Sequence, residues 1–352
     1  MKHKLIVLTA AISMLFAAET SAQDFQLTSS GYFKSQGVDV MAFDDIYPEG
    51  HQGGVCIIMN GHRVATNGDI RLEATPGQWQ PVPKQLNRKV EGNSIIATMC
   101  YPDSSRHLTG FNPMIYPDLN FVYTVKVEPK GKQIEVTVDL DRPIPEHFLG
   151  MVGFNLEFFP GSLFGKPWIM DEKSGIYPQQ PNSPLMTTTP NHLHPGDYHN
   201  GKSPLANMKH LIGEGYSPIV ADDIISEPYA IGKKFTSRPD DPYSKLTIES
   251  LTGDLQLYDG RMNHNNGWFV LRSNIQAGVT KNAVKWIITP NIVNDWIYSP
   301  VIQTSQIGYH PEQVKEAIIE LDIRDEKRPE AELIRIDSNE SKVVQNIVPS
   351  EW

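Results

Sequence analysis

The chain has 352 residues, with 31 Lys and Arg against 41 Asp and Glu, so its formal net charge is −10. Hydrophobic residues make up 39% of the sequence and charged residues 20%, which suffices for a packed core and excludes a long disordered chain. The acidic balance argues against a general nucleic-acid-binding protein, because neutralising phosphates requires a basic excess. The 27 Pro and 26 Gly predict many turns, and their lack of a period excludes a collagen-like chain.

The first residues have the three-part layout of a secretory signal peptide. Residues 1–4 are basic, Leu5 to Ala18 form an uncharged apolar run, and residues 20–22 are small. We expect cleavage after Ala22, which makes residues 1–22 a signal peptide and places the mature chain in the periplasm or outside the cell. An uncleaved anchor is disfavoured, because the run Leu5 to Ala18 is shorter than the about 20 apolar residues that a membrane-spanning helix needs. No later segment is long and apolar enough to span a membrane either.

Alternating hydrophobicity predicts strands along much of the remaining chain. The run Val55 to Met59 ends at Asn60-Gly61, a strong hairpin turn signal. Residues 122–127 and 134–140 flank a turn at 129–132 and predict an antiparallel hairpin with one exposed face. Further strands are predicted over 93–100, 151–159, 245–251, 254–258, 268–272 and 283–289. The pattern predicts an all-β fold with a large antiparallel β-sandwich domain over residues 23–297.

Residues 160–210 differ in composition, with many Pro, Asn, His, Thr and Ser, and predict a long, mostly irregular excursion from the sandwich. Alternatively, this segment is an insertion that wraps a sheet edge. His192, His194, His199 and His210 have a spacing that could serve a metal. A metal site needs rigid presentation, which this composition does not predict, so we expect no metal and no cofactor.

Other catalytic constellations are not supported. The paired acids Asp44-Asp45, Asp222-Asp223 and Asp240-Asp241 lack the ligand spacing of a calcium loop, and surface solvation explains them. The sequence has neither a Gly-x-Ser-x-Gly elbow nor a Gly-rich phosphate loop. We therefore predict no catalytic residue.

Two cysteines, Cys56 and Cys100, allow one disulfide if the chain is secreted. Both lie in apolar, strand-like runs, where a free cysteine acts as a small hydrophobic residue. The disulfide and the two free cysteines both stay open as interpretations. A zinc site is not expected, because the spacing of the two cysteines resembles no zinc-binding module.

Aromatic side chains are the usual platform for sugars, because pyranose CH groups pack on an aromatic face. Burial is the general expectation for the six Trp, and Trp268 in particular lies in a predicted strand. Trp79 lies in a turn-rich setting, and Trp168 lies near the start of the irregular excursion. We predict carbohydrate contact first at Trp79 and then at Trp168.

A second unit begins near Val301, with further strands predicted over 314–321 and 333–336. An immunoglobulin-like sandwich needs about 100 residues and seven strands. Residues 301–352 are too few, so we expect an incomplete immunoglobulin-like domain.

The junction between the two units resembles a known family. Residues 301–311, Val-Ile-Gln-Thr-Ser-Gln-Ile-Gly-Tyr-His-Pro, and then Lys315-Glu316-Ala317 resemble the opening of the N-terminal immunoglobulin-like domain of family 9 glycoside hydrolases, which are cellulase-type enzymes. The preceding stretch resembles the β-rich leader of some secreted bacterial members, best over 155–158, 257–261 and 266–272.

In that family the immunoglobulin-like domain precedes an all-helical barrel, which carries the two carboxyls of an inverting hydrolase. This sequence has no Asp-Ala-Gly-Asp motif and no helical region of that size, so no catalytic residue is carried over. The resemblance implies the non-catalytic N-terminal part of a secreted, endoglucanase-type enzyme of polysaccharide degradation. Its implied partners are a β-glucan-type polysaccharide and a catalytic barrel that it docks against or orients.

Three alternatives remain open at this point. The chain is a stand-alone surface carbohydrate-binding protein, an enzyme with an unrecognised site in the sandwich, or a structural remnant. Exposed aromatic residues would favour the carbohydrate-binding protein, and sugar release by the pure protein would favour the enzyme. Aggregation of residues 301–352 would favour the structural remnant, because half a sandwich leaves edges and apolar faces exposed.

Overall fold

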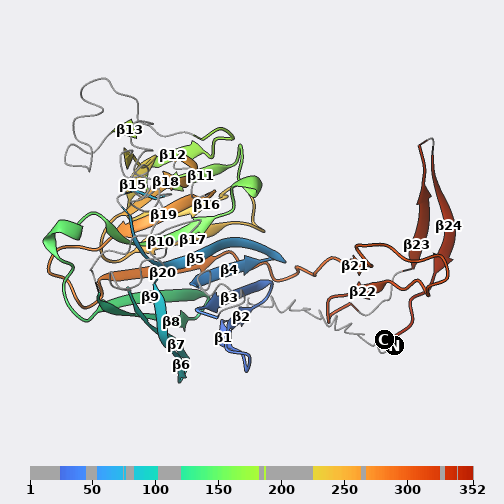
Figure 1. Ribbon diagram of the computed structural model, residues 1–352, viewed down its shortest axis with the longest axis horizontal. Helices are drawn as coiled ribbons and strands as arrows, with labels where there is room; N and C mark the ends of the chain where they lie inside the picture. Colours follow the sequence, from blue (N-terminus) through green and yellow to red (C-terminus); the bar gives the residue numbers. More distant parts are fainter. Residues whose placement is uncertain are drawn as a thin grey trace, which may run out of the picture.

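The computed structural model describes residues 24–44, 54–73, 75–76, 83–101, 120–181, 186–187, 225–262, 267–325, 330–338 and 340–351. Two nine-stranded antiparallel sheets pack face to face (Figure 1). The all-β fold class and the sandwich arrangement predicted from the sequence are confirmed.

The first sheet has the strand order β1-β2-β3-β4-β5-β10-β19-β18-β15. Its strands are β1 (Gln26–Leu27), β2 (Phe33–Ser35), β3 (Val38–Ala42), β4 (Val55–Met59), β5 (His62–Leu72), β10 (Val152–Phe158), β15 (Ala230–Gly232), β18 (Leu255–Asp259) and β19 (Phe269–Asn274).

The second sheet has the order β12-β11-β16-β17-β20-β9-β8-β7-β6. Its strands are β6 (Lys84–Glu91), β7 (Ser94–Cys100), β8 (Val122–Lys130), β9 (Gln133–Leu140), β11 (Pro167–Met170), β12 (Lys173–Ile176), β16 (Lys234–Ser237), β17 (Leu246–Ser250) and β20 (Val284–Pro290). A small separate pair joins β13 (Met186–Thr187) to β14 (Ile225–Ser226).

Each of the nine strands predicted in residues 55–289 has an observed counterpart, and β8 pairs with β9 as the predicted hairpin. The expectation of a mostly irregular segment over 160–210 is wrong for residues 167–176. There β11 and β12 form a hairpin at the edge of the second sheet. The short apolar run Pro167–Met170 sets this hairpin, because Trp168 and Met170 both point into the core.

The hydrophobic core fills the space between the two sheets. Phe154 on β10 meets Trp286 on β20 edge to face at 5.0 Å, and Phe158 on β10 meets Phe235 on β16 at 5.7 Å. Burial alternates along β8 and β20, so the second sheet has one buried and one more open face. The centre of the first sheet differs, because every residue of β10 is buried.

The predicted turn at Asn60-Gly61 joins β4 to β5. Both residues have positive φ, 52° and 79°, as a type I′ turn requires. A side chain added at Gly61 would place its Cβ 2.8 Å from Cε2 of Tyr298. Glycine is needed here both for the backbone conformation and for the close approach of Tyr298.

A left-handed backbone conformation costs an L-residue about 1–2 kcal/mol. We expect Gly61→Ala to lower the free energy of unfolding by more than this, because the added Cβ also clashes with Tyr298. Gly92→Ala is the matched control, because Gly92 also has positive φ and an added Cβ there meets nothing within 4 Å. Urea unfolding of both variants measures the difference. Equal losses would show that the Tyr298 contact contributes nothing.

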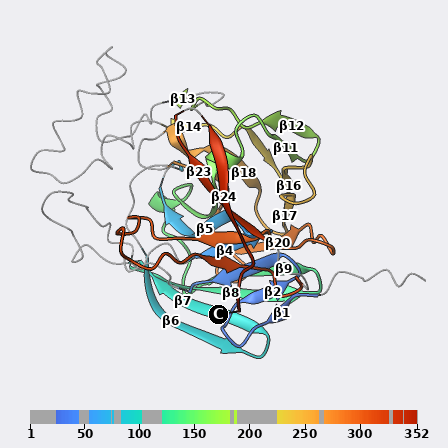
Figure 2. The ribbon, with the colours of Figure 1, turned by 90° about the vertical axis from the view of Figure 1, so that its right-hand side faces the viewer.

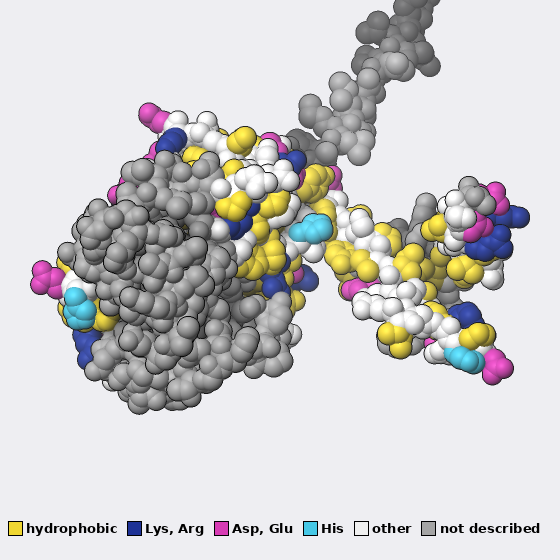
Figure 3. All heavy atoms as spheres, turned by 45° about the horizontal axis from the view of Figure 1, so that its top comes forward, with side chains coloured by type: hydrophobic (Ala, Val, Ile, Leu, Met, Phe, Trp, Pro, Cys, Tyr) yellow, Lys and Arg dark blue, Asp and Glu magenta, His cyan; other side chains and the backbone are white. Residues whose placement is uncertain are grey.

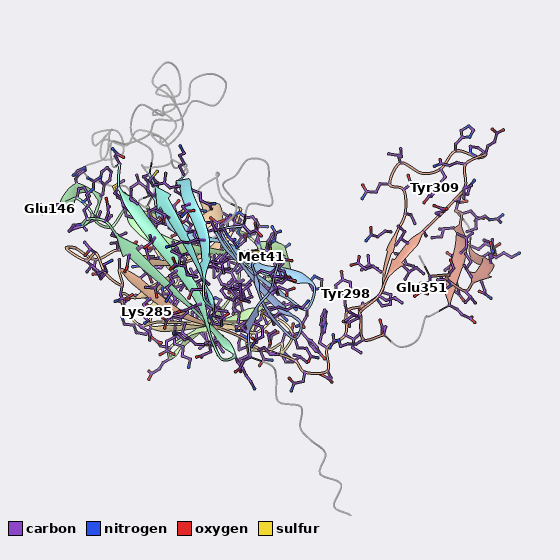
Figure 4. All side chains as sticks on the ribbon, turned by 90° about the horizontal axis from the view of Figure 1, so that it is seen from below. Met41, Glu146, Lys285, Tyr298, Tyr309 and Glu351 are labelled. Carbon is purple, nitrogen blue, oxygen red and sulfur yellow. The ribbon has the colours of Figure 1, made fainter. Side chains whose placement is uncertain are left out.

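Beyond the sandwich, the chain continues into two hairpins that Figure 1 shows as a separate extension and that lie in front of the sandwich in the end-on view of Figure 2. One pairs β21 (Val301–Gln303) with β22 (Ile318–Glu320), and the other pairs β23 (Ala331–Ile336) with β24 (Ser341–Ile347). We call residues 301–351 the C-terminal arm. Figure 4 shows Tyr298 where the arm leaves the sandwich, with Tyr309 and Glu351 farther out.

Within the described residues, no helix is long and apolar enough to cross a membrane. The predicted signal peptide lies outside the described residues.

Candidate functional site

The most unusual feature of the sandwich is a group of charged and amide side chains on the outward face of the first sheet. Core residues such as Ile70, Phe154 and Leu271 point inward, so their neighbours along β5, β10 and β19 point outward. The outward side chains are nonetheless buried. We call them the polar cluster, and its members are Asn67, Asp69, Arg71, Glu73, Asn155, Glu157 and Arg272.

The strand register explains why these residues meet. Asn155 on β10 lies opposite Asp69 on β5 and opposite Arg272 on β19, so one row of side chains crosses three strands. The β5–β10 register shifts between Asn155 and Glu157, which marks a bulge. Asn67 lies there with φ of 56°, and its Nδ2 donates to Oε2 of Glu157 at 2.7 Å. A bulge re-aims side chains, and here it turns Asn67 toward the cluster.

One half of the cluster is an ion pair between Glu73 and Arg272. Nη1 of Arg272 lies 3.3 Å from Oε1 of Glu73, and each side chain is only 1% exposed. Nη2 of Arg272 donates to the backbone carbonyls of Glu73 and Met151, and Nδ2 of Asn155 donates to Oε1 of Glu73 at 2.6 Å. A buried arginine and carboxylate with this many hydrogen bonds fix the ends of β5, β10 and β19 relative to one another.

Gly153 makes room for that arginine. A Cβ at Gly153 would lie 2.6 Å from Nε of Arg272, so a larger residue would displace the guanidinium. In the space that Gly153 leaves, Nε of Arg272 donates to Oδ1 of Asn274 at 2.6 Å.

The other half of the cluster surrounds Arg71. Its Nη1 lies 3.7 Å from Oδ2 of Asp69, and its two hydrogen bonds, to the carbonyls of Ile70 and Asn67, are both 3.4 Å long. Oδ1 of Asp69 accepts a hydrogen bond from Tyr123 of the second sheet at 2.9 Å. Arg71 is thus held loosely by comparison with Arg272.

Burial shifts the ionisation of two carboxyls in the cluster. It raises the pKa of Glu73 to about 7, although the nearby Arg272 and Arg71 oppose this shift. It raises the pKa of Asp69 to about 6, again against the attraction of Arg71. Carboxyls with such pKa values exchange protons near neutral pH, which is the range that acid–base chemistry and proton-linked binding use.

We expect the free energy of unfolding to fall as pH rises from 4.5 to about 7 because of Glu73. Within this window the folded chain keeps the Glu73 proton, whereas the unfolded chain releases it at the ordinary pKa of 4.5. Asp69 acts in the same direction, and Glu128, whose pKa is lowered to about 2, acts below the window.

Urea unfolding at several pH values, compared between the unaltered chain and Glu73→Gln, measures this effect. The uncharged variant should show a flatter dependence between pH 4.5 and about 7. Parallel curves would contradict the expectation.

The structure also has an open hollow of about 480 Å³ at one end of the sandwich. Its lining includes His62, Phe159, Arg238 and Ser244. The guanidinium of Arg238 forms ion pairs with Asp240 at 2.9 Å and with Asp241 at 3.1 Å. The paired acids Asp240-Asp241 of the sequence therefore bind an arginine side chain.

Trp168 is only 3% exposed and packs in the core, with its ring centroid 6.4 Å from that of Tyr229. In this position its ring offers no face to a sugar. Trp79 lies outside the described residues. Carbohydrate contact at the two residues stays a prediction, and the buried position of Trp168 argues against it there.

The predicted histidine group, with His192, His194, His199 and His210, lies outside the described residues, as does Asp222-Asp223. Cys56 on β4 and Cys100 on β7 belong to different sheets and are not joined by a disulfide in this structure.

The polar cluster was not predicted from the sequence. The alternation Asp69-Ile70-Arg71-Leu72-Glu73 was a usable signal for a strand with a polar face. Such a face is ordinarily solvated, and nothing in the pattern indicated that it is buried.

The C-terminal arm is the second feature of interest. Among the described residues, those of the hydrophobic core lie between positions 25 and 288, and none in the arm is buried. Hydrophobic side chains gather on its surface instead, as Figure 3 shows. The exposed apolar residues of the arm are Ile302, Ile307, Val314, Ile318, Ile323, Leu333, Ile334, Ile336, Val343, Val344, Ile347 and Val348.

We compared the chain with protein families, curated proteins and solved structures. No family model, no curated protein and no solved structure matches this chain.

Proposed function

We propose that this chain is the non-catalytic N-terminal part of a secreted polysaccharide-degrading enzyme similar to the family 9 glycoside hydrolases. In this proposal the sandwich is an accessory unit that assists contact with a β-glucan-type polysaccharide. The arm is an incomplete immunoglobulin-like unit that docks against a helical catalytic barrel. The chain is exported through a cleaved signal peptide.

The observation that carries the proposal is the apolar surface of the arm. Exposed apolar patches of this extent usually mark contacts with another protein surface. Ile307 and Ile323 are fully exposed, and Ile336 is 78% exposed. The family 9-like motif lies in the same segment, at residues 301–317, which motivates the choice of a catalytic barrel as the partner.

The docking test mixes the full chain with an isolated family 9 catalytic barrel and measures the complex by size-exclusion chromatography. We expect a complex that Ile336→Asp abolishes, because a charge in an apolar interface must be desolvated. Leu86→Asp is the matched control, since Leu86 is also exposed on a strand, β6, but lies outside the arm. Absence of a complex, or equal loss in both variants, would contradict docking through the arm.

A reducing-sugar assay on β-glucan tests the non-catalytic role. We expect no release above a blank by the pure chain alone. Release that Glu73→Gln abolishes would instead assign catalysis to the polar cluster, whose Glu73 has a pKa of about 7.

The second candidate is a stand-alone surface carbohydrate-binding β-sandwich protein. The open hollow of about 480 Å³ favours it, because its lining combines the aromatic ring of Phe159 with the polar side chains of His62 and Ser244. Affinity electrophoresis on β-glucan gels, in the absence of any catalytic barrel, distinguishes it. Strong retardation without complex formation would support this second candidate.

A further inference from the structure

A second open hollow, of about 580 Å³, lies on the outer face of the second sheet. It crosses the neighbouring strands β16, β17, β20 and β9, all of which lie inside the sheet order. Its lining includes Lys234 and Thr236 of β16, Thr247 of β17 and Thr289 of β20, which are exposed or partly exposed. The hollow therefore has both room for a ligand and direct access from solvent. We call it the lysine hollow.

A row of hydroxyl and amide side chains crosses the lysine hollow. Thr247 on β17 lies opposite Thr236 on β16 and opposite Thr289 on β20. On β9, Gln133 donates from Nε2 to Oγ1 of Thr289 at 2.9 Å. Neighbouring strands are about 4.8 Å apart, so the four side chains extend over about 14 Å.

The row keeps hydrogen-bonding capacity for a ligand. Oγ1 of Thr236 and Oγ1 of Thr247 are 3.0 Å apart and share one hydrogen bond. A hydroxyl group has one donor and two acceptor positions, so one proton of this pair stays available. The hydroxyl of Thr289 accepts from Gln133 and keeps its own proton to donate.

The charge of the hollow is opposite to that of the chain. Three lysines, Lys132, Lys234 and Lys245, line it together with one acid, Glu249. Lys234 and Lys245 form no ion pair with any residue that the structure describes, although Lys234 lies opposite Glu249 in the strand register. The chain as a whole has a net charge of −10, so a local positive excess favours an anionic ligand at this place.

The position of the hollow selects among anionic ligands. An extended peptide binds a sheet by adding a strand at an unpaired edge, and the hollow lies over strands that are paired on both sides. An acidic sugar chain has hydroxyl groups that donate and accept along its length, as the threonine and glutamine row requires, and carboxylates that lysines bind.

We propose that the lysine hollow binds an acidic oligosaccharide whose sugar units carry carboxylates. Lys234 and Lys245 bind the carboxylates, and the row from Thr236 to Gln133 exchanges hydrogen bonds with the sugar hydroxyls. This inference goes beyond the proposed function, because a β-glucan is uncharged, and it does not depend on docking of the arm.

The experiment is isothermal titration of the full chain with three probes of similar length, tetragalacturonate, cellotetraose and tetraglutamate. We expect saturable binding of tetragalacturonate that weakens as sodium chloride is added, because salt screens exposed charges. The uncharged cellotetraose and the acidic peptide tetraglutamate should bind this hollow more weakly, since each lacks one of the two features that it recognises.

Lys234→Gln and Lys245→Gln test the charges. Each should bind tetragalacturonate about tenfold more weakly, because each removes a hydrogen bond to a charged group. Lys84→Gln is the matched control, since Lys84 is also an exposed lysine on a strand of the second sheet, β6, but lies outside the hollow. It should bind as the unaltered chain does.

Thr247→Val tests the hydroxyl row. It keeps the β-branched shape and should weaken tetragalacturonate binding about fivefold, the effect of one neutral hydrogen bond. Thr124→Val is its control, because Thr124 is partly exposed on β8 of the same sheet and does not line the hollow. Thermal melting verifies that each variant is folded.

Three results would overturn the proposal. They are no saturable binding of tetragalacturonate, binding of cellotetraose or tetraglutamate that is equally tight, and a loss in Lys84→Gln equal to that in Lys234→Gln. Complex formation with the barrel and retardation on β-glucan gels are separate measurements, so this proposal and the proposed function can fail separately.

Discussion

Replacing Arg272 by Met is expected to lower the free energy of unfolding by about 3–5 kcal/mol, because removing one partner of a buried pair leaves the other charge uncompensated. Glu73 would lose its guanidinium partner at 1% exposure, and the carbonyls of Glu73 and Met151 would lose their donor. Urea unfolding followed by tryptophan fluorescence measures the change.

Lys281→Met is the control for this variant. Lys281 pairs with Asp139 at 3.0 Å but is 77% exposed, and exposed pairs contribute about 0–1 kcal/mol. A loss in Arg272→Met no larger than that in Lys281→Met would show that the buried pair does not hold the three strands together.

Replacing Trp286 by Ala is expected to cost a similar amount, about 3–5 kcal/mol, through the cavity left in the core. The Trp286 side chain is fully buried, packs edge to face on Phe154, and donates from Nε1 to Oγ of Ser273 at 3.1 Å. It therefore connects β20 of the second sheet to β10 and β19 of the first.

Trp286→Phe separates the causes of that loss. It keeps an aromatic ring against Phe154 but removes the Nε1 donor, so its loss should be clearly smaller than that of the alanine variant. Thermal and urea unfolding of both variants provide the comparison. Equal losses would mean that the hydrogen bond to Ser273, rather than ring packing, carries the contribution.

The strands of the sandwich were largely predictable because one physical signal dominates them. Along β8 and β9 each side chain alternates between the core and the outer face, so the sequence has period two. The turn at Asn60-Gly61 was equally readable, because only a few residues tolerate two successive positive φ values.

The short edge strands were harder to predict. β11 contributes only two core side chains, Trp168 and Met170, and two points do not establish a period. Its partner β12 buries none of its side chains, so no hydrophobic pattern identifies it. Pairing with a neighbouring strand, which a single sequence does not display, defines both.

The polar cluster could not be predicted for a different reason. Glu73 and Arg272 are nearly two hundred positions apart, and their contact depends on the order β5-β10-β19. Period-two alternation predicts that a side chain lies on the face of the sheet opposite the core. It does not predict whether other parts of the chain bury that face.

The order β5-β10-β19 also has a kinetic consequence. The central strand β10 pairs on one side with β5, earlier in the sequence, and on the other with β19, more than a hundred residues later. Chains dominated by such non-local pairings fold slowly, because loop-closure entropy must be overcome before the contacts form. During synthesis, the strand that neutralises Glu73 emerges last of the three. Until then, a half-formed sheet would present an unpaired edge at β10, and such edges promote misassociation. A nascent chain of this topology therefore benefits from being kept unfolded until residue 274 has been made.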